Sequence, residues 1–264
     1  MVQKIPQHVQ NVPLFPLPSL LLDHHKTEQL GVYFMFVNSH VFLFNTSFNI
    51  KFRSIMNMQG RGSTEAANGL KTTTSAFIAR KINIETIVGD DKFEAARKSL
   101  IPVHVEIVGY DEHEGYLERL IRKVKKRTRC DFHNIPYKKC PKLVIVSSLK
   151  ANITWLDMFP KKNGISKTLS PISIVLVTPK IDATHATLYP GSYAHCKINV
   201  RSKNKIKTSS VTEITLRISN ERGGRYFMSL KTCSRLHSYQ WQELPIDNAV
   251  IYCVEEMATA EEAL

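Results

Sequence analysis

The residues best suited to chemistry in this sequence are a dense group of lysines and arginines between Arg119 and Lys142. The group contains ten cationic side chains and a single acid, Asp131. Its cationic members are Arg119, Arg122, Lys123, Lys125, Lys126, Arg127, Arg129, Lys138, Lys139 and Lys142. So many like charges repel one another unless an anion lies opposite, and the commonest biological polyanions are nucleic acid and acidic lipid. The pattern predicts a polyanion-binding surface, with an ordinary solvated helix face as the alternative.

A second basic stretch follows in the C-terminal half. No acid occurs between Lys197 and Thr212, and residues 202–210 are polar enough to form a loop between strands. The cations of this stretch are Lys197, Arg201, Lys203, Lys205 and Lys207. A basic loop beside a basic helix would extend the electrostatic footprint for a polyanion. An ordinary solvated hairpin tip explains the same residues equally well.

Side chains that could hold a metal or carry catalysis are sparse. Cys130, His133 and Cys140 offer three soft ligands, but structural zinc sites usually have two close pairs and this segment has one. Asp90 and Asp91 could bind a divalent cation as paired acids do in nucleases, although no third carboxylate stands out and Asp91 also fits a helix cap. The sequence contains neither a Gly-rich phosphate loop followed by Lys-Ser/Thr nor a Gly-x-Ser-x-Gly motif. We therefore expect no enzyme activity, no cofactor and no bound metal.

Composition limits the class of protein. The 264 residues are 43% hydrophobic, which suffices for a core, and their net charge of +13 favours an acidic partner. Five cysteines do not make a disulfide framework in a chain of this length, so a reducing compartment, cytosol or nucleus, is expected. The run Arg122–Arg127 matches a basic nuclear-import signal, which adds an import receptor to the expected partners. No apolar stretch is long enough to span a membrane, and no signal-peptide pattern is present.

The hydrophobic periodicity between residues 75 and 254 predicts one α+β domain, with two helices among strands in its first half and an antiparallel, β-rich second half. The helices are expected at Asp91–Leu100 and Asp111–Thr128, and the second is amphipathic with a basic polar face. A turn at residues 221–224 would join two strands, because Gly223 and Gly224 permit positive φ. The expected strands are Phe77–Val88, Val103–Val108, Leu143–Leu149, Ile172–Val177, Tyr193–Val200, Val211–Ser219, Tyr226–Leu230 and Ala249–Val254.

Residues 1–58 differ in composition from the rest, with few charges and half of all the phenylalanines between Phe34 and Phe52. Two interpretations stay open for this segment. It forms a hairpin that pairs Val32–Val37 with Val41–Phe44, or it is a translated leader that is not part of the native fold. Residues 59–74 are rich in Gly, Ser and Thr and predict a flexible linker, and residues 255–264 form an acidic tail.

In overall character, residues 56–264 resemble the matrix proteins of negative-strand RNA viruses, of the plant rhabdovirus type. The resemblance lies in the size, the clustered charge of Arg119–Arg129, the β-rich second half and the lack of a catalytic motif. The Pro-Pro-x-Tyr motif of many animal-virus matrix proteins is missing. The resemblance implies a non-enzymatic virion protein that binds RNA or nucleocapsid and acidic membrane, self-associates, and is found in the host nucleus or cytoplasm.

Two other functions fit the same residues. A plant-virus movement protein is also basic and β-rich, and it binds single-stranded nucleic acid without sequence preference. A nuclease or integrase-like enzyme from a mobile element would instead depend on Asp90, Asp91 and Mg²⁺.

Overall fold

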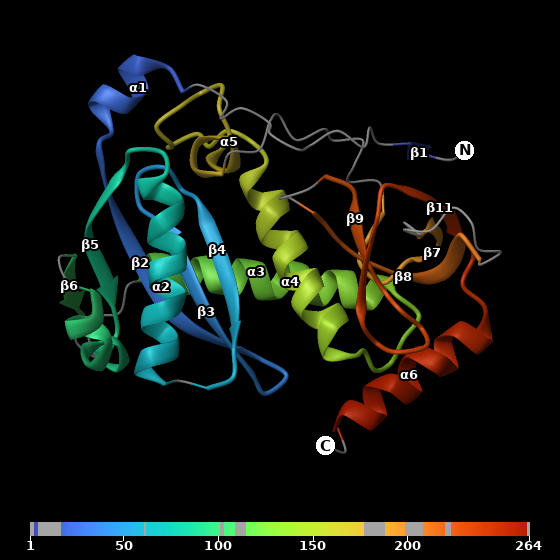
Figure 1. Cartoon of the computed structure of the whole chain (residues 1–264). Helices are drawn as coiled ribbons and strands as arrows, with labels where there is room; N and C mark the ends of the chain where they lie inside the picture. Colours follow the sequence, from blue (N-terminus) through green and yellow to red (C-terminus); the bar gives the residue numbers. More distant parts are fainter. Residues whose placement is uncertain are drawn as a thin grey trace. The chain divides into compact units, whose positions relative to one another are not determined.

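The computed structural model of the chain describes residues 3–4, 17–60, 62–100, 103–108, 115–176, 188–198, 208–219 and 223–262. The described residues divide into two compact units, each with its own sheet (Figure 1). The five-stranded unit comprises the described residues within Pro13–Lys126 and Asn152–Lys180. The six-stranded unit comprises those within Met1–Val12, Arg127–Ala151 and Ile181–Leu264. The division differs from the single domain expected at residues 75–254.

The sheet of the five-stranded unit combines a hairpin meander with parallel strands. Its strand order is β4-β3-β2-β5-β6, in which the pairs β2–β3 and β3–β4 are antiparallel and the pairs β2–β5 and β5–β6 are parallel. The strands are β2 (Thr27–Val37), β3 (His40–Ser47), β4 (Arg53–Met58), β5 (Asn83–Gly89) and β6 (His104–Ile107). A parallel neighbour needs a crossover connection. Helix α2 (Ser63–Ile78) precedes β5, and the 3₁₀ helix η1 (Asp91–Leu100) connects β5 to β6.

The phenylalanine-rich segment is the centre of this sheet. Strands β2 and β3 form the expected hairpin, and the turn residues Asn38 and Ser39 both have positive φ, as a two-residue turn that matches the strand twist requires. Phe42 and Phe44 are completely buried. The segment Thr27–Met58 therefore supplies three of the five strands of this sheet, in contrast to the leader interpretation. Its low charge reflects burial within the sheet.

Helix α2 occupies most of the segment in which the sequence predicts a flexible linker. Its buried residues are mainly small, among them Ala66, Ala67 and Thr73. Gly69 lies against β3 so closely that a Cβ there would come within 2.7 Å of the Leu43 side chain. Small residues let the helix approach the sheet, and the same small residues resemble a linker when composition alone is considered.

Three expected strands are helices in the structure. Leu143–Leu149 lies in α4 (Lys142–Asp157), Ile172–Val177 overlaps α5 (Pro171–Val175), and Ala249–Val254 lies in α6 (Asn248–Glu262). A short apolar run fits a buried helix as well as a buried strand, so periodicity alone does not distinguish them. The start of α5 is also marked by Pro171 and by the Ser170 hydroxyl, which accepts a hydrogen bond from the Ser173 amide.

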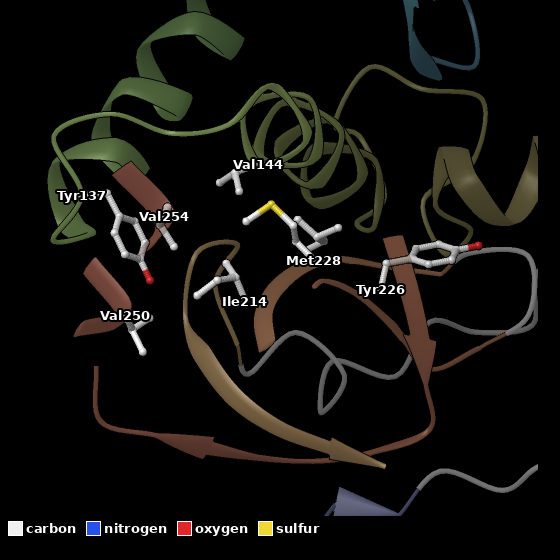
Figure 2. Packing of buried hydrophobic residues seen from close by; sticks show 8 residues of the cluster. Tyr137, Val144, Ile214, Tyr226, Met228, Val250 and Val254 are labelled. Atoms are coloured by element: carbon white, nitrogen blue, oxygen red, sulfur yellow. The ribbon is translucent and has the colours of Figure 1, made fainter. Parts of the chain in front are cut away.

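The six-stranded unit contains the antiparallel β-structure expected for the second half. Its strand order is β1-β11-β7-β8-β9-β10, and every pair is antiparallel. The strands are β1 (Gln3–Lys4), β7 (Tyr193–Lys197), β8 (Ser210–Ile218), β9 (Arg225–Met228), β10 (Arg235–Ser238) and β11 (Gln240–Leu244). Figure 2 shows the core of this unit, in which Val144, Ile214, Met228 and Val254 pack together from α4, β8, β9 and α6. The α+β class predicted from the sequence is confirmed.

The remaining helices are α1 (Ser19–His24) and α3 (Gly115–Asn134). None of the helices in the described ranges combines the length and the apolar character needed to cross a bilayer.

Candidate nucleic-acid interface

Helix α3 is amphipathic, and one face of it is buried. Leu117, Ile121 and Val124 recur at helical spacing and are 1%, 8% and 0% exposed, and Thr128 continues the same buried face one turn later. The helix packs closely on the central strand, because a Cβ on Gly31 of β2 would lie only 2.7 Å from the Leu117 side chain. The lack of a side chain at residue 31 lets α3 sit directly on the sheet.

Helices α2 and α3 cover opposite faces of the five-stranded sheet, as Figure 1 also shows. Leu43, which contacts α2, pairs with Phe34 of β2, and Phe34 lies an odd number of residues from Gly31, which contacts α3. Successive residues of a strand point to opposite faces, so the two helices lie on opposite sides. The start of α3 is further fixed by Tyr116, whose ring lies 6.0 Å from that of Phe48 and 4.9 Å from the Lys51 ammonium group.

The face of α3 opposite to this packing surface carries an exposed line of cations. We call this line the cationic face, and its members are Arg119, Arg122, Lys123, Lys126 and Arg129, all exposed. They follow one another at intervals of one or three residues and so occupy about 120° of the helix circumference. Lys125 and Arg127 differ from them, because both are half-buried and make interactions of their own. The basic group therefore separates into an exposed line of five cations and two cations that belong to the packing of the protein.

Acids of α6 contact the segment that follows α3 in the sequence. The Lys139 ammonium group lies 2.8 Å from Glu262 Oε2. The backbone amides of Lys138 and Lys142 donate to the carboxylates of Glu255 and Glu261, at 2.8 and 2.7 Å. The acidic tail expected at residues 255–264 therefore includes helical acids that contact this segment. The ion pair with Glu262 competes with a polyanion for Lys139, whereas the hydrogen bond from Lys138 comes from its backbone amide and its side chain is exposed.

The second basic stretch is described only at its start. Lys197 is exposed at the end of β7. Arg201, Lys203, Lys205 and Lys207 lie outside the described residues.

The weak zinc candidates do not form a site in the part of the chain that the structure describes. Within it, no group of three or more His, Cys, Asp or Glu side chains is arranged to hold a metal ion. Cys130 and His133 are exposed near the end of α3. Burial, reinforced by Glu255, raises the pKa of the Cys140 thiol to about 12, which disfavours the thiolate that zinc requires.

Asp90 directly follows β5, at the edge where the parallel strands β2, β5 and β6 have their carboxyl ends. Its Oδ2 lies 3.5 Å from the Lys92 ammonium group, and its Oδ1 is buried without a hydrogen-bond partner. Burial and the neighbouring Asp91 raise the pKa of Asp90, and Lys92 opposes them. Asp91 is exposed at the first position of η1. The two acids are adjacent, but their environments differ.

One pair of exposed side chains was not predicted as a site from the sequence. Trp155, in the last turn of α4, and Phe159, just beyond that helix, have ring centroids 5.4 Å apart and an interplanar angle of 76°. Their spacing of four residues is a signal that becomes visible only if residues 142–157 are assigned to a helix.

Comparison with known proteins gives little. No protein-family model matches the sequence, and no curated protein matches it. Among solved structures, the chain is similar to the catalytic core domain of BIV integrase, with 13% sequence identity and a TM-score of 0.37 over 56% of this chain and 93% of that one. The matched structure is an enzyme's catalytic core, so this comparison lends no support to the expectation that the chain is not an enzyme. At this TM-score the likeness assigns neither a reaction nor a substrate to the chain.

Proposed function

We propose that this chain binds nucleic acid through the cationic face of α3. The observation that carries the proposal is the division of the helix into two faces, with Leu117, Ile121 and Val124 buried and five cations exposed on the other side. A solvated helix face normally mixes both signs of charge, whereas no acid occurs between Glu118 and Asp131. An uninterrupted line of cations is stabilised by phosphates opposite it.

The dimensions of the cationic face suit a phosphate backbone. From Arg119 to Arg129 the helix advances about 15 Å, which matches several phosphates along one strand of nucleic acid. Arginine guanidinium groups can bind phosphate in a bidentate manner, and lysine ammonium groups add point charges. Such contacts fix position without reading bases, so we expect binding without strong sequence preference.

The experiment compares two variants with the same change in net charge. In the first, Arg119, Arg122, Lys123 and Lys126 are replaced by Gln, which keeps good helix propensity. In the matched control, four exposed lysines elsewhere, Lys26, Lys71, Lys98 and Lys231, are replaced by Gln. We expect the affinity of the first variant for RNA and DNA to fall far more than the affinity of the control variant. Equal losses would contradict a localised site.

The same variants distinguish the other polyanion that the sequence suggested. Acidic membrane is an alternative partner for a cationic helix face, and vesicles containing phosphatidylserine test it. Binding to the vesicles together with no measurable binding to RNA or DNA would overturn the nucleic-acid proposal. Self-association and binding to an import receptor remain predictions for separate tests.

A second candidate function is Mg²⁺-dependent phosphodiester cleavage at the end of β5. It is favoured by the unpartnered, buried Asp90 Oδ1 at the carboxyl edge of parallel strands, where ligands commonly bind in α/β sheets. Incubation with a labelled strand and Mg²⁺ tests it. If the chain cleaves phosphodiester bonds at this site, EDTA and the substitution Asp90→Asn should each abolish the cleavage. Cleavage that persists in Asp90→Asn would contradict this second function.

A further inference from the structure

Trp155 and Phe159 form an aromatic pair that is open to solvent. Trp155 is 39% exposed and Phe159 is 49% exposed, and their rings meet edge to face. Single exposed aromatic residues are ordinary in soluble proteins. Two such rings in contact present a larger apolar surface, and an apolar surface rimmed by polar groups is typical of a binding site.

The pair is held firmly by the residues around it. Ile153 and Leu156 of α4 are 4% and 8% exposed. Asp157, the last residue of α4, is fully buried, and its carboxylate accepts a hydrogen bond of 2.6 Å from the Arg53 amide while pairing with the Arg53 guanidinium group. The end of α4 is thereby attached to β4. Trp155 and Phe159 flank this anchored residue in the sequence, so their rings are presented from a fixed part of the unit.

The chain that follows the pair is basic. No acid occurs between Met158 and Leu176, whereas Lys161, Lys162 and Lys167 do. Lys162 and Lys167 are exposed, and the Lys161 ammonium group donates to the Leu156 carbonyl at the end of α4. An apolar aromatic surface followed by cations matches a ligand that has flat apolar rings joined by phosphates. An acidic or apolar peptide would match only one of the two features.

We propose that Trp155 and Phe159 stack on unpaired bases, so that the nucleic acid bound by this chain is single-stranded. The inference rests on the proposed binding of nucleic acid through α3 and adds the class of substrate. Stacking on aromatic side chains is available only to bases that are not paired within a duplex, and all four bases can use it. The exposed Lys162 and Lys167 contact the phosphates between the stacked bases.

The experiment uses the intrinsic fluorescence of the full chain. The sequence contains two tryptophans, Trp155 and Trp241, and Trp241 is only 3% exposed. Titration with a single-stranded oligothymidylate should quench the fluorescence, and a duplex of equal length should not. Trp155→Phe should lose the quenching while it keeps the binding, because phenylalanine also stacks. Quenching that persists in Trp155→Phe would overturn the inference.

Affinity measurements separate this inference from the proposed function. The double variant Trp155→Ala/Phe159→Ala should bind the single strand about 5- to 150-fold more weakly for each base that no longer stacks, with duplex binding unchanged. Unchanged single-strand affinity, or equal losses for both forms, overturns the stacking role and leaves the α3 proposal intact. If the cationic-face variant keeps its affinity for both forms, the proposed function fails instead.

Acrylamide must also quench the fluorescence of Trp155 in the free protein. Protection of Trp155 from acrylamide would show that other parts of the protein already cover the aromatic pair.

Discussion

Leu117 of α3 lies directly over Gly31 of the central strand β2, with room for no side chain between them. A Cβ on residue 31 would come within 2.7 Å of Leu117 Cδ2 and 3.0 Å of Phe48 Cζ. This close approach sets the distance between the helix and the sheet. Because the buried face of α3 is fixed there, its cationic face points away from the sheet.

Substitution of Gly31 by Ala should destabilise the five-stranded unit by about 1–3 kcal/mol, the usual cost of overpacking. Leu117 and Phe48 must move to admit the methyl group. Urea denaturation measures the loss, and Gly60→Ala is the matched control because nothing lies within 4 Å of the Cβ that it would add. Combining Gly31→Ala with Leu117→Ala should cost less than the sum of the two single changes. Strict additivity would contradict the close packing of the two residues.

The buried Asp157 should make stability depend on pH. Burial raises the pKa of Asp157 to about 7, although the partner Arg53 opposes the shift. The folded state then keeps a proton that an unfolded aspartate, with an ordinary pKa near 4, has already released. The free energy of unfolding should therefore fall as the pH rises from about 4 to about 7. Denaturation across this range in wild type and in Asp157→Asn measures the effect, and an identical pH slope in both would refute it.

Removal of residues 1–58 should abolish cooperative folding of the five-stranded unit. The deletion takes away β2, β3 and β4, including the central strand on which α3 packs, and leaves only β5 and β6 of that sheet. A circular-dichroism melt of residues 59–264 against the full chain provides the measurement. A sharp melting transition of the shorter chain with undiminished amplitude would show that the sheet is dispensable.

The import-like run Arg122–Arg127 should be hidden in the folded chain. Val124 in its middle is completely buried, and Lys125 and Arg127 are half-buried, whereas an import receptor reads such a run in extended form. Residues 118–132 fused to a large fluorescent reporter should enter the nucleus, and the full chain should stay in the cytosol. Equal nuclear import of the two would show that the end of α3 opens readily.

Some elements could be predicted because their side chains repeat with a clear period. Leu117, Ile121 and Val124 recur at helical spacing, and Gly223 and Gly224 have the positive φ that a turn allows. Helices α2 and α4 were missed for opposite reasons. The buried face of α2 consists of small residues that resemble a linker, and α4 begins with a short apolar run that fits a strand equally well.

The sequence predicts which cations form the candidate site, but not how their side chains are arranged in space. The sequence identifies all the cations between Arg119 and Lys142 as one group. It does not reveal that Glu262 pairs with Lys139, because that ion pair joins residues more than a hundred positions apart. Nor does it reveal that Trp155 and Phe159 meet, because this depends on where α4 ends and on the course of the chain just beyond it.

The salt dependence of binding tests the central claim most directly. The affinity of the full chain for single-stranded RNA should fall linearly with the logarithm of salt concentration, with a slope set by the number of phosphates that the protein neutralises. Replacing Arg119, Arg122, Lys123 and Lys126 by Gln should reduce the magnitude of that slope by roughly 0.7 for each phosphate that is no longer neutralised. The control at Lys26, Lys71, Lys98 and Lys231 should leave the slope unchanged. An unaltered slope in the cationic-face variant would contradict the claim that α3 binds nucleic acid.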